Sequence, residues 1–166
     1  MIKLLDNPKT DTYNELKTLV LSQEFPWYYM DSGDGLSYFG HITINRPENL
    51  YSTAVSPHTL LFGEVMIDLI HSNGLVKNAK GFHLVRGSVN LVLPSDGRQF
   101  SDKHIDHLFP HINLIAYLTS SGGRTICGEE EHNPKEDDVI VMDGEHYMEL
   151  PKKERRIILL ATLMVY

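Results

Sequence analysis

The sequence contains little cysteine, little positive charge and no long hydrophobic run. Cys127 is the single cysteine, so no disulfide can form within the chain, and a reducing compartment is favoured. The longest apolar run covers ten residues, 157–166, about half of the roughly 20 that a membrane-spanning helix needs. The first residues also lack the apolar stretch of a signal peptide. We therefore expect a cytoplasmic protein with no membrane association.

Positive charge is scarce because 15 Lys and Arg face 22 Asp and Glu, which gives a formal net charge of −7. Proteins that bind nucleic acid neutralise phosphates with an excess of cations, so a nucleic-acid partner is disfavoured. Hydrophobic residues make up 42% and charged residues 22% of the chain, as in ordinary globular proteins. A chain of 166 residues suits one core, and we expect residues 1–166 to form a single domain.

The first part of the chain, residues 1–80, is predicted to be mixed. Thr12 followed by Glu15 is a capping-box pattern, which predicts a helix beginning at Thr12. A second helix is predicted to run from Ser56, as the N-cap before Pro57, to the Asn73-Gly74 stop signal. Between these helices, the aromatic segment 25–29 predicts the start of a strand, with Trp27, Tyr28 and Tyr29 in sheet and core packing. The polar stretch 31–35 predicts a loop.

From residue 82 onward the pattern changes to short strands separated by turn signals. Residues 82–93 alternate around β-branched side chains and end at the turn sequence 94–97. Further strands are predicted at 103–107, 111–119, 124–127, 138–142, 145–149 and 155–165. This pattern is typical of an antiparallel sandwich or barrel. We expect a mainly β fold, a double-stranded β-helix or jelly roll in residues 82–166, braced by two or three helices from residues 1–80.

The tripeptide His104-Ile105-Asp106 is the central chemical feature. In a strand, residues i and i+2 project from one face, so this imidazole and carboxylate would point together with backbones about 7 Å apart. His146, at the start of another predicted strand, is the candidate third ligand. Two histidines and one carboxylate on one face of a metal leave the other face open, as in non-haem Fe(II) oxygenases. The tripeptide alone is a weak signal, because it occurs by chance in many proteins.

A longer ordered series strengthens this interpretation. After His104-x-Asp106 the chain continues with Ile115-Ala116-Tyr117-Leu118, Gly122-Gly123-Arg124-Thr125, the segment 139–144, His146 and Arg156. The series resembles the 2-oxoglutarate/Fe(II) oxygenase superfamily, and more closely its prolyl-hydroxylase-like branch of small bacterial and phage enzymes. The sequence departs from that pattern at Thr119, where the family often has Asn, and at Ile158, where Ser or Thr is frequent.

The resemblance implies roles for individual residues. His104, Asp106 and His146 would bind Fe(II), and Arg156 with Tyr117 would bind the distal carboxylate of the cosubstrate 2-oxoglutarate. Arginine suits this role because its planar fork binds a carboxylate in bidentate fashion. Arg155 is the rival, and the family spacing after Pro151 together with a strand phase shared with Ile158 and Leu160 favours Arg156. With O₂, such an enzyme would hydroxylate its substrate, which the resemblance suggests is a prolyl or other protein side chain, or a small molecule.

Two other functions are open at this point. One is a cupin-like metal-binding jelly roll, in which His104, His107 and His111 would be ligands together. The strand phase opposes this, because His107 and His111 are odd-numbered against an even-numbered pair. The other is a catalytically inactive binding or virion-structural module. His132 is expected at the surface, and the Gly128–Glu131 run is expected to form a solvated turn. Arg86 and Asn90 are expected either to point into the barrel mouth or to make structural hydrogen bonds.

Overall fold

The computed structural model describes residues 1–31, 36–47, 56–95 and 97–166, so most of the loop predicted at 31–35 and one residue of the turn predicted at 94–97 lie outside it. In this part of the chain two helices and ten strands form, and the strands build two antiparallel sheets. The larger sheet has seven strands in the order β1-β8-β5-β10-β4-β3-β2, and the smaller has three in the order β7-β6-β9. The strands are β1 (Ile2–Leu5), β2 (Tyr28–Asp31), β3 (Ser37–Ile44), β4 (Phe82–Val92), β5 (Ile112–Tyr117), β6 (Thr125–Cys127), β7 (Glu130–His132), β8 (Val139–Met142), β9 (His146–Met148) and β10 (Arg156–Val165).

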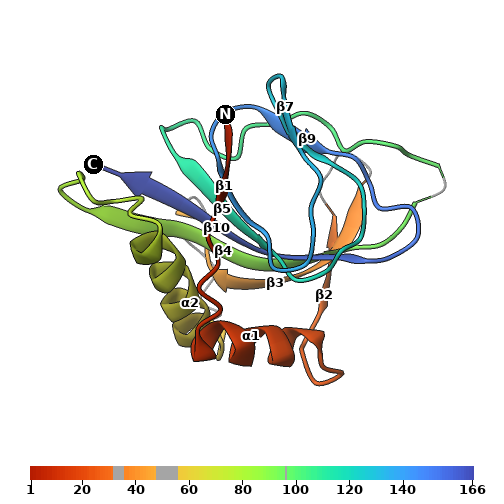
Figure 1. Cartoon of the computed structure of the whole chain (residues 1–166). Helices are drawn as coiled ribbons and strands as arrows, with labels where there is room; N and C mark the ends of the chain where they lie inside the picture. The colour runs from red at the N-terminus through yellow and green to blue at the C-terminus, as the bar shows by residue number, and fades with distance from the viewer. Residues whose placement is uncertain (32–35, 48–55, 96) are drawn as a thin grey trace.

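The two helices, α1 (Asp11–Leu21) and α2 (Thr59–Ser72), cover one face of the seven-stranded sheet, and the three-stranded sheet lies over the other face (Figure 1). The expected mainly β fold with N-terminal helices is confirmed, with two helices in the described residues. The main core lies between the helices and the sheet. Its members include Leu16 and Val20 of α1, Val65 of α2, and Leu159 and Leu163 of β10.

Period-2 alternation along the two central strands separates the core from the space between the sheets. In β10, Ile157 and Leu159 belong to the main core, whereas Ile158 and Leu160 face the opposite side. The register pairs Leu160 with Ser88 and Ile158 with Asn90, so the even-numbered residues of β4 share that face. The side of the sheet away from the helices therefore carries the side chains that line the interior of the double-stranded β-helix.

Helix α1 begins slightly earlier than predicted, and helix α2 begins later. The N-cap of α1 is Thr10, whose hydroxyl accepts from the Tyr13 N–H at 3.3 Å, while the Thr12 hydroxyl donates to the Asp68 carboxylate instead. The N-cap of α2 is His58 rather than Ser56, because the Ser56 hydroxyl accepts from the His58 N–H at 3.0 Å and holds that residue outside the helix. The predicted stop of the second helix is confirmed.

Several strand predictions need correction. The strand predicted at 103–107 is absent; His104 and Phe100 form isolated bridges instead. Strands β1, β3 and β7 were not predicted. Of the Gly128–Glu131 run that was expected to be a turn, Gly128 and Glu129 form one, whereas Glu130 and Glu131 belong to β7. Tyr28 and Tyr29 do not pack in the core: they lie 59% and 65% exposed on β2, at the edge of the sheet. Within the described residues, no helix is both long and apolar enough to cross a membrane.

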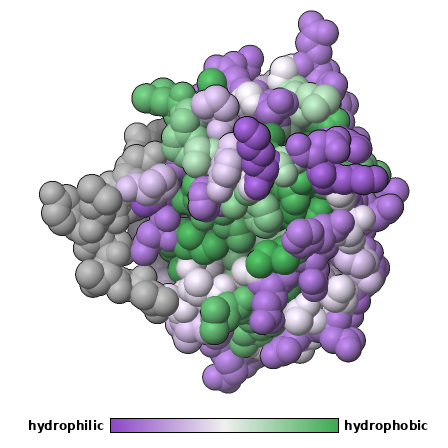
Figure 2. Space-filling model, turned by 90° about the vertical axis from the view of Figure 1, so that its left-hand side faces the viewer, coloured by the Kyte–Doolittle hydropathy of each residue, from purple (hydrophilic) through white to green (hydrophobic). Residues whose placement is uncertain are grey.

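The surface is mixed rather than uniformly polar. Figure 2 shows one face on which hydrophobic residues gather towards the middle and hydrophilic side chains form the rim. More than half of the surface of a typical folded protein is contributed by apolar atoms, so such an area needs no special explanation.

Candidate metal centre

His104 and His146 lie opposite each other as a backbone-paired couple. The His104 N–H donates to the His146 carbonyl at 3.0 Å, and the His146 N–H donates to the His104 carbonyl at 2.9 Å. Antiparallel pairing of this kind puts the two side chains on one side, and the ring centroids are 4.5 Å apart. His146 also pairs with Cys127 of β6, so the His104 segment continues the smaller sheet beyond β9.

The same local contact orients both imidazole rings. Nδ1 of His104 lies 3.0 Å from the Asp102 carbonyl, and Nδ1 of His146 lies 3.0 Å from the Gly144 carbonyl. A carbonyl oxygen only accepts, so each Nδ1 carries the proton and each Nε2 keeps its lone pair. Metal-binding histidines usually have their second nitrogen fixed in this way. Gly144 has a φ of +99°, a conformation that glycine adopts without strain.

Asp106 completes the group. Donor atoms of His104, Asp106 and His146 all lie within 4.8 Å of one another, and in the described ranges these residues form the one such group of three. His146 Nε2 is 3.4 Å from one oxygen of Asp106. The donor set of two imidazoles and a carboxylate fits Fe(II), and the predicted residues are brought together. His104 is exposed while the Asp106 and His146 side chains are buried, so the group opens to one side.

The Asp106 carboxylate is held by side chains that the sequence interpretation did not assign to it. Arg86 Nη1 donates to Oδ1 at 2.5 Å, and Asn113 Nδ2 donates to Oδ2 at 2.7 Å. Asn113 in turn accepts from the Thr162 hydroxyl at 2.8 Å. Arg46 donates to the Asp106 backbone carbonyl at 3.0 Å and to Oδ1 at 3.4 Å. For Arg86 the sequence analysis left two roles open, and the structure shows both: it faces the pocket and makes a hydrogen bond.

These surroundings set the charge of the site. Burial alone would raise the pKa of Asp106, but attraction to Arg86 and to the neighbouring histidines outweighs it and holds the pKa below its ordinary value. Burial lowers the pKa of His146, so its imidazole is neutral near pH 7. An ionised carboxylate and a neutral imidazole are the forms that bind a metal ion.

The three residues line a pocket of about 540 Å³ between the two sheets. The wall of the pocket on the larger sheet includes Ile115 of β5 and Ile158 and Leu160 of β10, which are apolar. Tyr117 and Arg156 lie on the same wall. A pocket with apolar walls and a few polar groups is typical of a small-molecule site.

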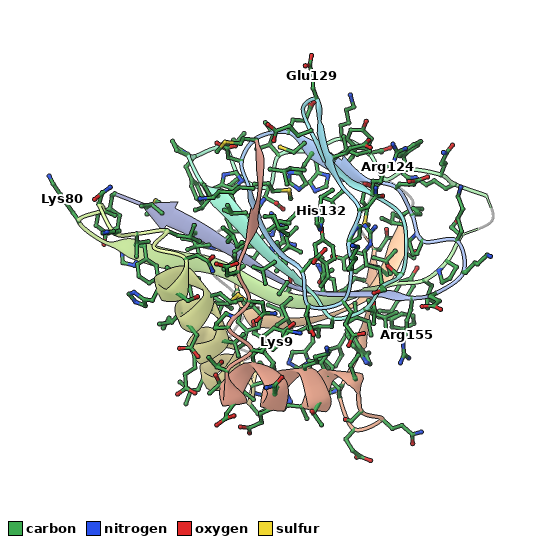
Figure 3. All side chains as sticks on the ribbon, in the orientation of Figure 1. Lys9, Lys80, Arg124, Glu129, His132 and Arg155 are labelled. Atoms are coloured by element: carbon green, nitrogen blue, oxygen red, sulfur yellow. The ribbon has the colours of Figure 1, made fainter. Side chains whose placement is uncertain are left out.

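Arg156 is 1% exposed, the largest of the fully buried side chains. Its Nη2 donates to the carbonyls of Gly122 and Gly123, while Nε has no hydrogen-bond partner in the described part of the chain. Both glycines have positive φ, +67° and +75°, so the Gly-Gly turn of the motif presents its carbonyls to the arginine. Arg155, in contrast, is exposed and points outward (Figure 3).

Tyr117 lies beside Arg156 and is also buried. Its hydroxyl is 2.7 Å from the Thr125 hydroxyl, and burial raises its pKa to about 12. It therefore stays protonated and can donate a hydrogen bond at neutral pH. Burial lowers the pKa of Arg156, yet a guanidinium remains charged in proteins. This end of the pocket thus offers a buried cation with an unused donor and a neutral phenol, which suits a carboxylate ligand.

The remaining histidines lie outside the metal group. His107 is buried and stacks on Phe109 with centroids 4.6 Å apart, and His111 Nδ1 contacts the Phe109 carbonyl. Neither belongs to the group of three, so the cupin-like ligand set does not form in the described residues. The surface prediction for His132 was wrong: its side chain is only 14% exposed and its ring is 5.6 Å from the ring of Tyr117.

Sequence reasoning missed Arg46 and Asn113 altogether. Asn113 sits on the pocket face of β5, at an odd-numbered position with Ile115 and Tyr117, so strand phase was a usable signal for it. Arg46 follows the end of β3 and carried no such signal, because its position depends on the pairing of β3 with β4.

Comparison with known proteins agrees with this geometry. No protein-family model matches the chain, and no curated protein matches it in sequence. Its fold, however, is that of the 2-oxoglutarate/Fe(II) oxygenases, since solved structures of that class superpose over nearly the whole chain.

Three of these structures illustrate the likeness. An oxidoreductase of the 2OG-Fe(II) oxygenase family from Burkholderia pseudomallei superposes with a TM-score of 0.70 at 13% identity, covering 98% of this chain and 84% of the other. A viral collagen prolyl hydroxylase from Paramecium Bursaria Chlorella virus-1, in complex with 2OG, gives 0.61 at 10% identity, covering 98% and 94%. A prolyl hydroxylase from Trichoplax adhaerens, in complex with a hypoxia inducible factor peptide fragment, gives 0.60 at 14% identity, covering 99% and 83%.

Proposed function

We propose that this protein is an Fe(II)- and 2-oxoglutarate-dependent oxygenase that hydroxylates its substrate. The observation that carries the proposal is the joint presence, in one pocket, of the His104, Asp106 and His146 donor group and of the buried Arg156. A metal-binding jelly roll that works without 2-oxoglutarate has no need for a buried cation in the pocket. The cation therefore distinguishes an oxygenase from a cupin-like site.

In this proposal His104 and His146 bind iron through Nε2, because their Nδ1 atoms are engaged with backbone carbonyls. Asp106 supplies the negative ligand. Bound Fe(II) supplies the activation of O₂ that hydroxylation requires, coupled to oxidation of 2-oxoglutarate to succinate and CO₂. The protein's own contribution is to fix the ligands and to provide a pocket with apolar walls.

Arg156 and Tyr117 orient the cosubstrate. The free Nε of Arg156 and the protonated hydroxyl of Tyr117 are donors for the carboxylate of 2-oxoglutarate that lies away from the metal. Apolar contacts come from Ile115, Ile158 and Leu160 along the same wall. Such a low-dielectric wall strengthens the charge-assisted hydrogen bonds because water does not compete for the donors.

The substrate proposal is coarser. The Trichoplax structure contains a peptide bound to a prolyl hydroxylase, and this chain superposes on it over nearly its full length. A prolyl or other protein side chain is therefore our first choice, with a small molecule as the second. The single-domain organisation over residues 1–166 and a cytoplasmic location also remain proposals.

The test is spectroscopic. Addition of Fe(II) and 2-oxoglutarate without oxygen is expected to give the weak visible charge-transfer band of the chelate, and His104→Ala is expected to abolish it. Lys135→Gln, which removes a charge in the loop before β8, is the matched control and should keep the band. A wild-type protein without the band, or a His104→Ala variant with it, would show that the protein is not this kind of oxygenase.

A further inference from the structure

Besides Arg156, the pocket contains a pair of cations that neither the metal nor the cosubstrate explains. Arg46 and Arg86 both donate to Asp106, which bears a single negative charge. Their side chains are 37% and 12% exposed, so Arg86 is largely removed from water. Two guanidinium groups thus converge on one carboxylate, and that carboxylate is also the proposed ligand of a metal dication.

This pair and Arg156 come from different ends of the β4–β10 pairing. In that register Arg86 is opposite Thr162, whereas Arg156 is opposite Val92. The six steps from Arg156 to Thr162, at about 3.4 Å each, separate the two backbone positions by roughly 20 Å along the sheet. In the proposed function Arg156 and Tyr117 bind one carboxylate of 2-oxoglutarate and the metal binds the other end of the molecule, so no anion besides Asp106 is assigned to Arg46 and Arg86.

Most donors of the pair are unused. A guanidinium has five N–H groups. Among the described residues Arg46 has acceptors on Asp106 alone, and Arg86 has a single acceptor, Asp106 Oδ1. A buried cation with incomplete pairing is costly, and an incoming anion would relieve that cost. This local excess of positive charge stands out because the whole chain has a formal net charge of −7.

We propose that Arg46 and Arg86 bind a carboxylate of the substrate, and this inference rests on the oxygenase function proposed above. The pair leaves one positive charge unbalanced by Asp106, which matches a monoanion rather than a phosphate dianion. The planar fork of arginine binds carboxylates in bidentate fashion. The carboxylate belongs either to a free small acid, such as an amino acid, or to an acidic residue or C-terminus of a peptide.

The experiment compares matched pairs of ligands that differ only in this charge. The protein is loaded with 2-oxoglutarate and with Mn(II) in place of Fe(II), so that it binds substrate without turnover. It is then titrated calorimetrically with the free amino acids and with their carboxamides. A second arm uses peptides that contain Asp or Glu and the same peptides with Asn or Gln. We expect at least one carboxylate to bind about tenfold or more tightly than its amide, since a hydrogen bond between charged groups contributes this much. The arm in which this occurs identifies the source of the carboxylate.

Variants separate substrate binding from support of the metal site. Arg46→Gln should bring the carboxylate-to-amide ratio close to one, Arg46→Lys should retain part of it, and Arg155→Gln, which removes an exposed cation outside the pocket, should leave it unchanged. The Fe(II)–2-oxoglutarate band should persist in Arg46→Gln. A ratio near one for all pairs in the wild type, an unchanged ratio in Arg46→Gln, or loss of the band in that variant would each overturn the inference. Absence of the band in the wild type would instead overturn the oxygenase proposal.

Discussion

Removal of the Arg156 charge is the most decisive perturbation of the cosubstrate site. Arg156 is 1% exposed, its Nη2 is engaged with the Gly122 and Gly123 carbonyls, and its Nε has no partner in the described residues. Nε can therefore give one charge-assisted hydrogen bond to a carboxylate. Such a bond contributes ~1.5 kcal/mol or more, so Arg156→Gln should lose at least ~1.5 kcal/mol of 2-oxoglutarate binding. At 1.4 kcal/mol per factor of ten, this is a weakening of about tenfold or more.

The assay is an anaerobic titration of 2-oxoglutarate into the Fe(II)-loaded protein, followed by the chelate band. Arg155→Gln is the matched control, because it removes the same charge one residue away from an exposed side chain and should change the dissociation constant less than about twofold. Arg156 also holds the Gly122-Gly123 turn, so thermal unfolding of each variant is measured alongside, and Arg156→Lys should recover part of the affinity. Wild-type affinity in Arg156→Gln, or an equal loss in Arg155→Gln, would refute the assignment.

Three further outcomes are expected from other parts of the molecule. His104→Ala should lower the affinity for Mn(II) by about 100-fold without lowering the melting temperature, measured by calorimetry and thermal unfolding, because this ligand is exposed; wild-type affinity would exclude it as a ligand. Burial opposes ionisation of Asp137, but hydrogen bonds from two lysines and a tyrosine lower its pKa from 3.8 to about 2. The ionised Asp137 therefore stabilises the folded protein above about pH 4, and this stabilisation is lost as the pH falls towards 2. Asp137→Asn should thus cost on the order of 2 kcal/mol at pH 7 and almost nothing near pH 2 in denaturant titrations, and a pH-independent cost would refute the ion-pair account. In Gly123→Ala the new Cβ would clash with the Glu149 carbonyl, so this variant should destabilise the fold by about 2 kcal/mol or more. Gly122→Ala, with open space around it, should cost only ~1 kcal/mol for its positive φ, and equal costs would contradict the clash.

Strand periodicity predicted the site well where the strands are long. In β4 and β10 the alternation of apolar residues put Arg156 on the pocket side and offered that side as one of two alternatives for Arg86 and Asn90, and all three line the pocket. Register in a two-sided sheet is fixed by burial of one face. The run of short strands predicted the fold, and the ordered series that resembles the oxygenases strengthened the choice of His146 as the third residue of the group. Both signals come from sequence patterns that extend over ten residues or more.

Short or charged strands gave no such pattern. β1 has four residues and β7 has three, two of them glutamates, so their strand conformation depends on partners far along the chain. The strand expected at 103–107 failed for the opposite reason: its alternation was local, and the chain there makes only isolated bridges. His104 and Asp106 nevertheless lie close together, as predicted. The strand geometry from which this was predicted was wrong.

A local contact with the carbonyl two residues earlier fixes the imidazole ring of three histidines, not two. His104, His111 and His146 all have Nδ1 at 2.8–3.0 Å from such a carbonyl, so each has its lone pair on Nε2, the nitrogen that could bind a metal. Only His104 and His146 join the metal group, because the reciprocal backbone bonds between them bring their rings to Asp106. A contact within three residues thus orients each ring so that it could bind a metal. Pairing between distant segments of the chain decides which of these histidines come together. A single sequence therefore reveals which histidines are able to bind a metal more readily than which of them do.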